Sequence, residues 1–245
     1  MRVFVLLLAF CASALGQGFP FPGGHTAHGG GGTWTLVQHK FNDGCASATT
    51  CTVTVSALGS GHQLELLVGT ADATNFATLV SVSGGGTWTQ CAACTLQWND
   101  GAGTNWSSIG AYNLSSSSGA TSVTVTVNHA MGSGEWAVGF AEWSWSGSSA
   151  SFDTGGTANN SGAGCTSCTG PTLTLTGSSD ALMSMAFPGG AVSAATVYTT
   201  FQDFLPTTGA AFLGLLNTSS GSPPAYTQSP SSFITISSLA LKGNP

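Results

Sequence analysis

The segment Ser122-Val-Thr-Val-Thr-Val-Asn128 places valine and threonine at alternate positions. In an extended strand, successive side chains point to opposite faces, so this segment has one apolar and one polar face. Such alternation of β-branched residues is typical of a half-buried antiparallel strand. Cys51-Thr-Val-Thr-Val-Ser-Ala57 repeats the pattern, and Pro171-Thr-Leu-Thr-Leu-Thr176 has leucine in place of valine. The three segments predict an antiparallel all-β protein.

Further short segments have strand composition and are separated by Gly-, Ser- and Asn-containing turns. They are Thr33–Lys40, Gln63–Thr70, Ala77–Ser83, Ile109–Leu114, Leu182–Phe187, Val197–Phe204, Phe212–Leu216 and Phe233–Leu241. No segment sustains a helical period. We therefore predict one jelly-roll-like antiparallel β-sandwich domain over residues 33–245. In its last strand the apolar phase slips, which predicts a bulge near Ser237–Ser238.

The segment Gly134–Trp145 is apolar on both faces. Trp136, Val138 and Phe140 lie on one side, and the other side carries Ala137, Ala141, Trp143 and Trp145. A strand that is covered on both faces is usually central in its sheet. Within it, Gly139 would allow a neighbouring element to approach closely.

One short repeat is visible. Gly30-Gly-Gly-Thr-Trp-Thr35 recurs as Gly84-Gly-Gly-Thr-Trp-Thr89, and each copy is followed by Asn-Asp-Gly. Asn-Asp-Gly suits tight turns that require a positive φ. We interpret the repeat as two similar hairpins in one sandwich, with two duplicated domains as the alternative.

The N-terminus has the features of an export signal. Arg2 precedes an apolar run from Val3 to Ala12, and the small residues Ala14 and Gly16 follow. We predict a signal peptide over residues 1–16 and a secreted, extracellular or cell-surface protein without membrane insertion. Residues 17–32, rich in Gly, Pro and His, are expected to form a flexible arm.

Charged residues make up only 5% of the chain, with nine carboxylates. After signal removal, the basic side chains would be those of Lys40 and Lys242. Two cations cannot form a phosphate-binding track, so we expect no nucleic acid partner. Polysaccharides and other surface proteins are the expected partners, and no cofactor is expected.

Six cysteines of the expected mature chain form three local pairs: Cys45 with Cys51, Cys91 with Cys94, and Cys165 with Cys168. In an exported chain they predict disulfides, and local pairing is the simplest of the fifteen connectivities. The alternative is one zinc site built from the two C-x-x-C pairs. Because export argues against that site, we expect no metal.

No catalytic motif is present, so we expect no catalytic residues and no enzyme activity. Glycoside hydrolysis requires two carboxyl groups that flank the sugar bond. Glu142 is the best single candidate, because it shares a strand face with Phe140 and burial would raise its pKa. Glu135 would point to the opposite face of the strand. Glu65 on another strand is the remaining candidate partner.

Aromatic residues gather in the central half of the chain. A tryptophan face on a sandwich can stack on sugar rings, and we take Trp106, Trp143 and Trp145 as candidate ligand-binding residues. For most of these rings, however, we favour the interpretation that they fill the core, since large aromatic side chains are mostly buried.

Three segments together resemble a broad group of secreted bacterial β-sandwich domains of uncharacterised function. They are the strand ending at Gly69, the Gly84–Trp88 turn, and the strand Ala137–Gly147 with its Glu-Trp-Ser-Trp-Ser-Gly end. The resemblance implies a sandwich and an exported setting. We therefore expect a non-catalytic secreted or cell-surface protein that acts by binding or as a structural component. A carbohydrate-binding module using exposed tryptophans and a glycoside hydrolase using Glu142 are the alternatives.

Overall fold

The computed structural model describes residues 31–45, 47–160 and 164–244. This part of the chain forms sixteen β-strands in antiparallel sheets, so the predicted all-β sandwich class is confirmed. None of the described residues belongs to a helix with the length and apolarity that a membrane crossing requires. The expected signal peptide (1–16) and most of the expected arm (17–32) lie outside the described residues.

The first half of the described chain contains β1 (Trp34–Asn42), β2 (Ala48–Thr54), β3 (Gln63–Asp72), β4 (Leu79–Ser83), β5 (Thr89–Asn99), β6 (Asn105–Asn113), β7 (Ser122–Met131) and β8 (Trp136–Trp145). The second half contains β9 (Ser149–Asn159), β10 (Cys165–Thr169), β11 (Asp180–Pro188), β12 (Ala191–Thr196), β13 (Phe201–Phe204), β14 (Ala211–Thr218), β15 (Ala225–Ser232) and β16 (Ile234–Asn244).

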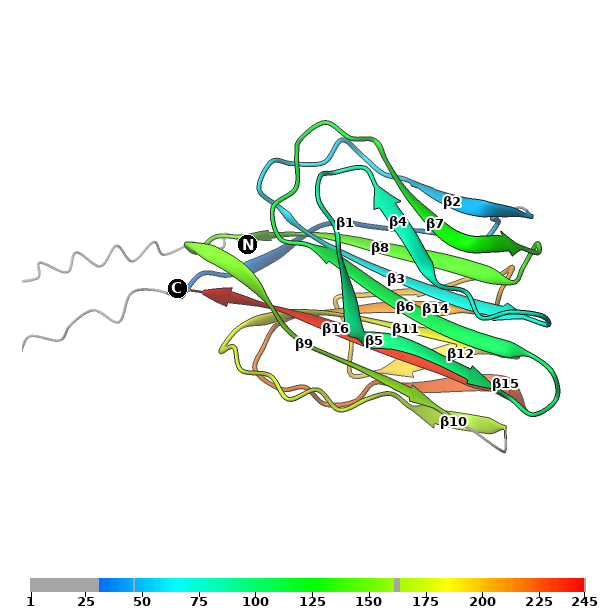
Figure 1. Cartoon of the computed structure of the whole chain (residues 1–245). Coiled ribbons are helices and arrows are strands. Elements are labelled where there is room, and N and C mark those ends of the chain that lie inside the picture. Colours follow the sequence, from blue (N-terminus) through cyan, green and yellow to red (C-terminus); the bar gives the residue numbers. More distant parts are fainter. Residues whose placement is uncertain (1–30, 46, 161–163, 245) are drawn as a thin grey trace, which may run out of the picture.

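Four sheets stack face to face (Figure 1). Sheet B (β2-β7-β4) covers one face of sheet A (β1-β8-β3-β6-β5), and sheet D (β10-β15-β12) covers one face of sheet C (β13-β14-β11-β16-β9). The other faces of sheets A and C pack against each other and enclose a middle core. The sandwich expected over residues 33–245 is therefore built with four layers rather than two.

The two halves have the same topology. Counted from the first strand of each half, both large sheets have the order 1-8-3-6-5 and both small sheets have the order 2-7-4. Eight antiparallel strands that cross between two sheets in this way form a jelly roll. The molecule therefore consists of two jelly rolls packed through their large sheets, a duplication much larger than the short repeat seen in the sequence.

The strand pairing also matches between the halves. The strand that opens each half carries one extra residue, Val37 in β1 and Asp153 in β9, where it pairs with the last strand of that half. The next residue pairs with Glu142 in the first half and with Ala240 in the second. Glu142 and Ala240 also have matching positions relative to β3 and β11. The two bulges are thus equivalent.

The alternating segments form strands as predicted at β2 and β7. Val53, Val123 and Val125 are buried in the core between sheets A and B. The threonines between them lie on the outer face, where the hydroxyls of Thr52 and Thr124 are 2.8 Å apart. The apolar face is buried and the threonine face stays accessible, as a half-covered sheet requires.

Strand β8 is covered on both faces, as predicted. It lies between β1 and β3 in sheet A. Trp136 and Phe140 belong to the core against sheet B, whereas Ala141 and Trp143 belong to the middle core.

Glycines set the distance between the two halves. A Cβ atom at Gly139 would lie 2.1 Å from Cδ1 of Phe212 on β14, and one at Gly69 would lie 2.4 Å from Cβ of Phe187 on β11. Both separations are far below van der Waals contact, so these aromatic residues occupy the space that the glycines leave. The predicted close approach at Gly139 is confirmed.

Two strand-level predictions are wrong. Residues 171–176 form no strand; Leu173 is buried against the second half, and its N–H donates to the Gly221 carbonyl at 2.9 Å. The alternation of leucine and threonine in this segment reflects the burial of Leu173, although the segment joins no β-ladder. The bulge near Ser237–Ser238 is also absent, because β16 pairs with β11 in unbroken register. The apolar phase slips because both faces of β16 are buried, with Ile236 in one core and Leu239 in the other.

The interpretation of the repeat as two hairpins holds only for its second copy. There β5 and β6 pair through Asn99 and Asn105 around the Asn-Asp-Gly turn. After the first copy, β1 pairs with β8 and β2 pairs with β7, so β1 and β2 form no hairpin.

Candidate functional site

Strands β1 and β13 lie on one flank of the stack. Each is an edge strand, β1 in sheet A and β13 in sheet C. The bulge at Val37 shifts the alternation of β1, and beyond it His39 faces the second half. Phe41, two residues further along the strand, shares the face of His39.

His39 and Asp203 form a dyad across the boundary between the halves. His39 Nδ1 lies 2.7 Å from Asp203 Oδ2. The imidazole also stacks on Phe201, with ring centroids 4.4 Å apart and planes inclined by 8°. When Nδ1–H donates to the carboxylate, Nε2 is left as a hydrogen-bond acceptor. Among the described residues, no group hydrogen-bonds to His39 Nε2.

A groove of about 400 Å³ opens at this dyad, lined by His39, Lys40, Phe41 and Asp203. Phe41 is 40% exposed. Within the described part of the chain, Lys40 has no ion-pair partner. The groove thus combines an aromatic ring, an ammonium group, an acceptor nitrogen and a carboxylate. Such a set can stack on a sugar ring and hydrogen-bond its hydroxyl groups.

The tryptophans proposed as ligand-binding residues lie elsewhere. Trp143 is fully buried and Trp106 is 5% exposed, so the expectation that they form an exposed stacking face is wrong. Trp143 Nε1 donates to Glu65 at 2.7 Å, and Trp106 Nε1 donates to Asp100 at 3.1 Å. Both rings belong to the middle core. The packing of one sandwich on another creates this core and requires large side chains to fill it.

Trp145 is half-buried beside the same core. Its ring centroid lies 5.1 Å from that of Trp34, and its Nε1 donates to the Asn244 carbonyl at 3.1 Å. The side chain therefore joins the ends of β1, β8 and β16. It offers at most a partial face to a ligand.

Glu142 and Glu65 do not form a catalytic pair. Both are fully buried, but Glu142 lies on the sheet B side of sheet A, whereas Glu65 faces the middle core and accepts from Trp143. Burial raises the pKa of Glu65 well above its ordinary value, and the Trp143 hydrogen bond offsets this only in part. Because the sheet separates the two carboxyl groups, they cannot flank one glycosidic bond.

Most other carboxylates also have structural partners. Eight of the nine accept hydrogen bonds within the protein, and they are Asp43, Glu65, Asp72, Asp100, Glu135, Glu142, Asp153 and Asp203. The ninth, Asp180, is fully buried. The few charges of this chain therefore act mainly as caps and internal pairs rather than as solvating groups.

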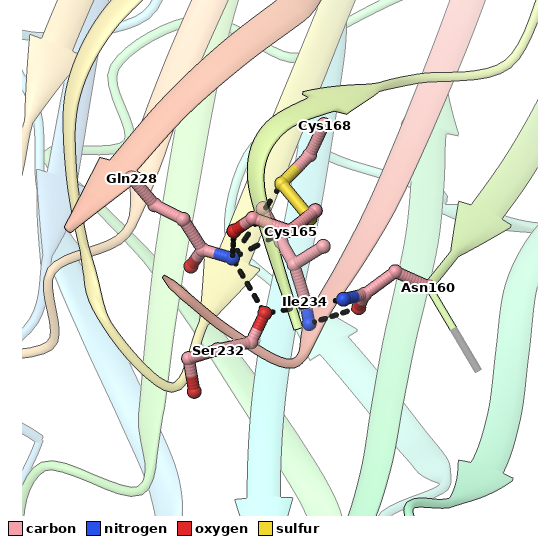
Figure 2. Close-up of a disulfide and its surroundings, with 6 residues drawn as sticks. All are labelled: Asn160, Cys165, Cys168, Gln228, Ser232 and Ile234. Carbon is pink, nitrogen blue, oxygen red and sulfur yellow. Dashed lines mark hydrogen bonds between the residues drawn. A yellow bond between two sulfur atoms is a disulfide. The ribbon is translucent and has the colours of Figure 1, made fainter. Parts of the chain in front are cut away.

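The three cysteine pairs are bridged locally, as predicted: Cys45–Cys51, Cys91–Cys94 and Cys165–Cys168. Disulfides of this kind are typical of proteins that mature outside the reducing cytoplasm. Figure 2 shows the third bridge beside Gln228, whose Nε2 donates to the Cys165 carbonyl at 2.7 Å and to the Ser232 carbonyl at 2.6 Å. Both cysteines of this bridge lie in edge strand β10, and the hydrogen bonds of Gln228 hold that strand against the end of β15.

The four C-x-x-C cysteines do not meet in one zinc site. Cys91 and Cys94 lie in the middle core, whereas Cys168 lies in the core between sheets C and D. In the described part of the chain, no three His, Cys, Asp or Glu side chains are grouped so that they could hold a metal ion.

The His39–Asp203 dyad was not predicted from the sequence. Its members are 164 positions apart. No local motif announces such a pair, and His39 by itself looked like an ordinary strand residue. The sequence shows only that His39 lies near the end of the predicted strand Thr33–Lys40 and that Phe41 follows that strand.

Comparison with known proteins identifies no relative. No family model, no curated protein and no solved structure matches the chain.

Proposed function

We propose that this is a non-catalytic secreted protein that binds an extracellular polysaccharide in the groove between β1 and β13. The observation that carries the proposal is the composition of the groove, with an exposed ring beside polar groups whose hydrogen-bonding capacity is not used internally. Sugars are bound by this combination of aromatic stacking and hydrogen bonds.

Each lining residue has a role in the proposed site. Phe41 stacks on a sugar ring, and His39 Nε2 accepts a hydroxyl proton. Asp203 and Phe201 fix the imidazole, so little conformational freedom is lost on binding. Lys40 favours a sugar that carries a carboxylate, because its ammonium lacks an ion-pair partner among the described residues.

Secretion is part of the proposal and is supported by the predicted signal peptide and by the three disulfides. The non-catalytic assignment is supported by the carboxylates, which are mostly engaged in structural hydrogen bonds.

Hydrolysis is the second candidate function, because an imidazole oriented by a carboxylate is also the arrangement of a general base. The second requirement, an acid or an oxyanion donor next to the dyad, has no candidate among the four lining residues except Lys40. Binding is therefore the stronger proposal.

The test is retention of the protein on a panel of neutral and acidic polysaccharides, with released sugar assayed in the same samples. We expect retention without release. Phe41→Ala should weaken binding about tenfold, as expected for the loss of about 1 kcal/mol of stacking. His39→Gln should also weaken it.

The matched control is Val80→Ala, which also shortens an exposed apolar side chain but lies on β4 of sheet B. It should leave binding unchanged. Sugar release that His39→Gln abolishes would replace binding with hydrolysis. If no polysaccharide is retained, or if the Phe41 and Val80 variants bind alike, the groove is not a sugar site and a structural role becomes the better explanation.

A further inference from the structure

The second half has a charged corner that lies away from the groove. It consists of Asp153 on the β9 bulge, Asp180 at the start of β11 and Lys242 on β16. Lys242 pairs directly with Asp180 across the sheet. Strands β9, β16 and β11, which are neighbours in sheet C, therefore meet at this point.

The groups at this corner are close, and the two carboxyl side chains are buried while the Lys242 side chain is 31% exposed. Lys242 Nζ lies 3.6 Å from Asp153 Oδ1, and the Asp153 side chain has no exposed surface. Thr176 holds the same carboxylate, with its N–H donating to Oδ2 at 2.7 Å and its hydroxyl donating to Oδ1. The Thr176 hydroxyl also accepts from Lys242 Nζ at 2.9 Å. An amine and a carboxyl carbon are thus held next to each other.

Asp180 is the unexplained member of the corner. It is fully buried, no N–H or O–H group of the described residues donates to its carboxyl oxygens, and its own carboxyl group hydrogen-bonds to the Asp153 carboxylate. Burial and the neighbouring Asp153 carboxylate raise the pKa of Asp180 to about 7, so this group can hold and release a proton near neutral pH. A buried acid whose hydrogen-bond partner is a second carboxyl group is costly to keep unless it has another role.

We propose that Lys242 and Asp153 form an intramolecular amide bond, with Asp180 as the proton relay. The bond would link β16 to β9 covalently and so close the second jelly roll between its last and first strands.

The reaction is a condensation that needs no other reactant. Hydrogen bonds hold the pKa of Asp153 below its ordinary value, so its carboxylate first takes the carboxylic proton of Asp180 on Oδ1. The Asp180 carboxylate that remains accepts a proton from the Lys242 ammonium, and the free amine attacks Cγ of Asp153. The Thr176 N–H stabilises the developing negative charge on Oδ2, as an oxyanion donor does. The C–Oδ1 bond breaks, and that oxygen leaves as water with two protons delivered from the amine through Asp180. Asp180 ends in the protonation state in which it began.

The first half provides an internal comparison. At the equivalent corner, Val37 replaces Asp153, His62 replaces Asp180 and Ser144 replaces Lys242. With neither an amine nor a bulge carboxylate, that corner cannot form the bond. The proposal is therefore specific to the second half.

The test is peptide mapping of the folded full-length protein after incubation at neutral pH, followed by reduction and denaturation. Trypsin cuts after Lys40 and Lys242, but an amide on Lys242 blocks the second cut. We expect the peptide that starts at Gly243 to be missing. We also expect a chymotryptic product in which the Asp153 and Lys242 peptides are joined with the loss of one water. Complete tryptic cleavage after Lys242, or a link to Asp180, would overturn the proposal.

Two variants separate the roles. Lys242→Arg keeps the positive charge but removes the amine nucleophile, so the joined product should be absent. Asp180→Asn keeps the shape of the side chain but cannot relay a proton, so it should remain folded and lose at least nine-tenths of the product. If Asp180→Asn forms the product as fully as the wild type, Asp180 is not the relay.

Discussion

The two halves share one strand topology but differ in the side chains that pair the buried polar groups beside the bulge of the first strand. We call this region the corner of each half. In each half, the first strand bulges where it pairs with the last strand. In the first half, the acidic group is Glu142 on the last strand, and three neutral or basic donors surround it. In the second half, Asp153 on the bulge carries the acid, and the last strand supplies Lys242.

The comparison shows which features the topology imposes. A bulge interrupts the ladder and leaves backbone and side-chain polar groups to be paired locally. Any set of side chains that pairs these polar groups is compatible with the fold. The first half uses one carboxylate with Gln38, Gly59 and His62, whereas the second half uses two carboxyl groups, a lysine and a threonine. Chemistry at the corner can therefore change without a change of topology.

The largest expected effect concerns the packing between the halves. Gly139→Ala should destabilise the protein by more than about 3 kcal/mol, because its Cβ would collide with the Phe212 ring across the middle core. Register makes Ser237 its equivalent in the second half, where the hydroxyl donates to the Cys94 carbonyl at 2.8 Å. Ser237→Ala should cost only about 1 kcal/mol, the value of one hydrogen bond. Urea unfolding of the two variants measures the difference.

A second substitution tests the mechanism of the Gly139 effect. Phe212→Leu in the Gly139→Ala background should recover part of the lost stability, because it removes atoms from the point of collision. If Gly139→Ala unfolds at the same urea concentration as the wild type, the two large sheets are not in the contact described above.

The next effect concerns the corner of the first half. Glu142→Gln replaces one of two acceptor oxygens with a donor, so either Gln38 or the pair formed by Gly59 and His62 loses its partner. In a fully buried site this should cost about 2–3 kcal/mol. In the Lys242→Arg background, where no amide forms, Asp180→Asn at the other corner should cost close to nothing at neutral pH, since the amide of the new side chain can still donate to the Asp153 carboxylate. If the two variants lose equal amounts of unfolding free energy, the two corners do not pair their buried polar groups in different ways.

The sequence predicted the strands best where only one face is buried. The Val–Thr alternation of β2 and β7 is clear because sheet B, to which both strands belong, is covered on one face only. The strands β9, β10, β12 and β15 were missed, since they are short or rich in Gly, Ser and Thr and their alternation is weak. The second jelly roll therefore escaped notice, and the two-faced burial of β16 was taken for a bulge.

The candidate sites were less predictable because they depend on contacts between the halves. Trp143 and Trp106 looked like surface residues only if one sandwich was assumed; the second sandwich buries them. The dyad of His39 and Asp203 forms for the same reason, since each residue comes from the edge of a different large sheet. By contrast, the disulfides were predictable because their partners are local in sequence.

The smallest expected effect is the pH dependence of the second corner. The ordinary pKa of an aspartate is 3.8, and that of Asp180 is raised to about 7 in the folded protein, so the folded state holds this proton more tightly. The resulting stabilisation is complete below about pH 4 and is lost as the pH rises through about 7. The difference between the two values corresponds to about 4 kcal/mol. Solvent near Lys242, whose side chain is 31% exposed, should screen this to about 2 kcal/mol.

This dependence is best measured in the Lys242→Arg background, where the amide cannot form and the cation is kept. Unfolding free energies at several pH values between 4 and 8 should fall for that variant, and adding Asp180→Asn should flatten the curve. The first corner gives the contrast, because three groups donate to Glu142, whereas no N–H or O–H group of the described residues donates to Asp180. A slope that survives Asp180→Asn must come from another group, and Asp180 would then have no special part in the stability of this half.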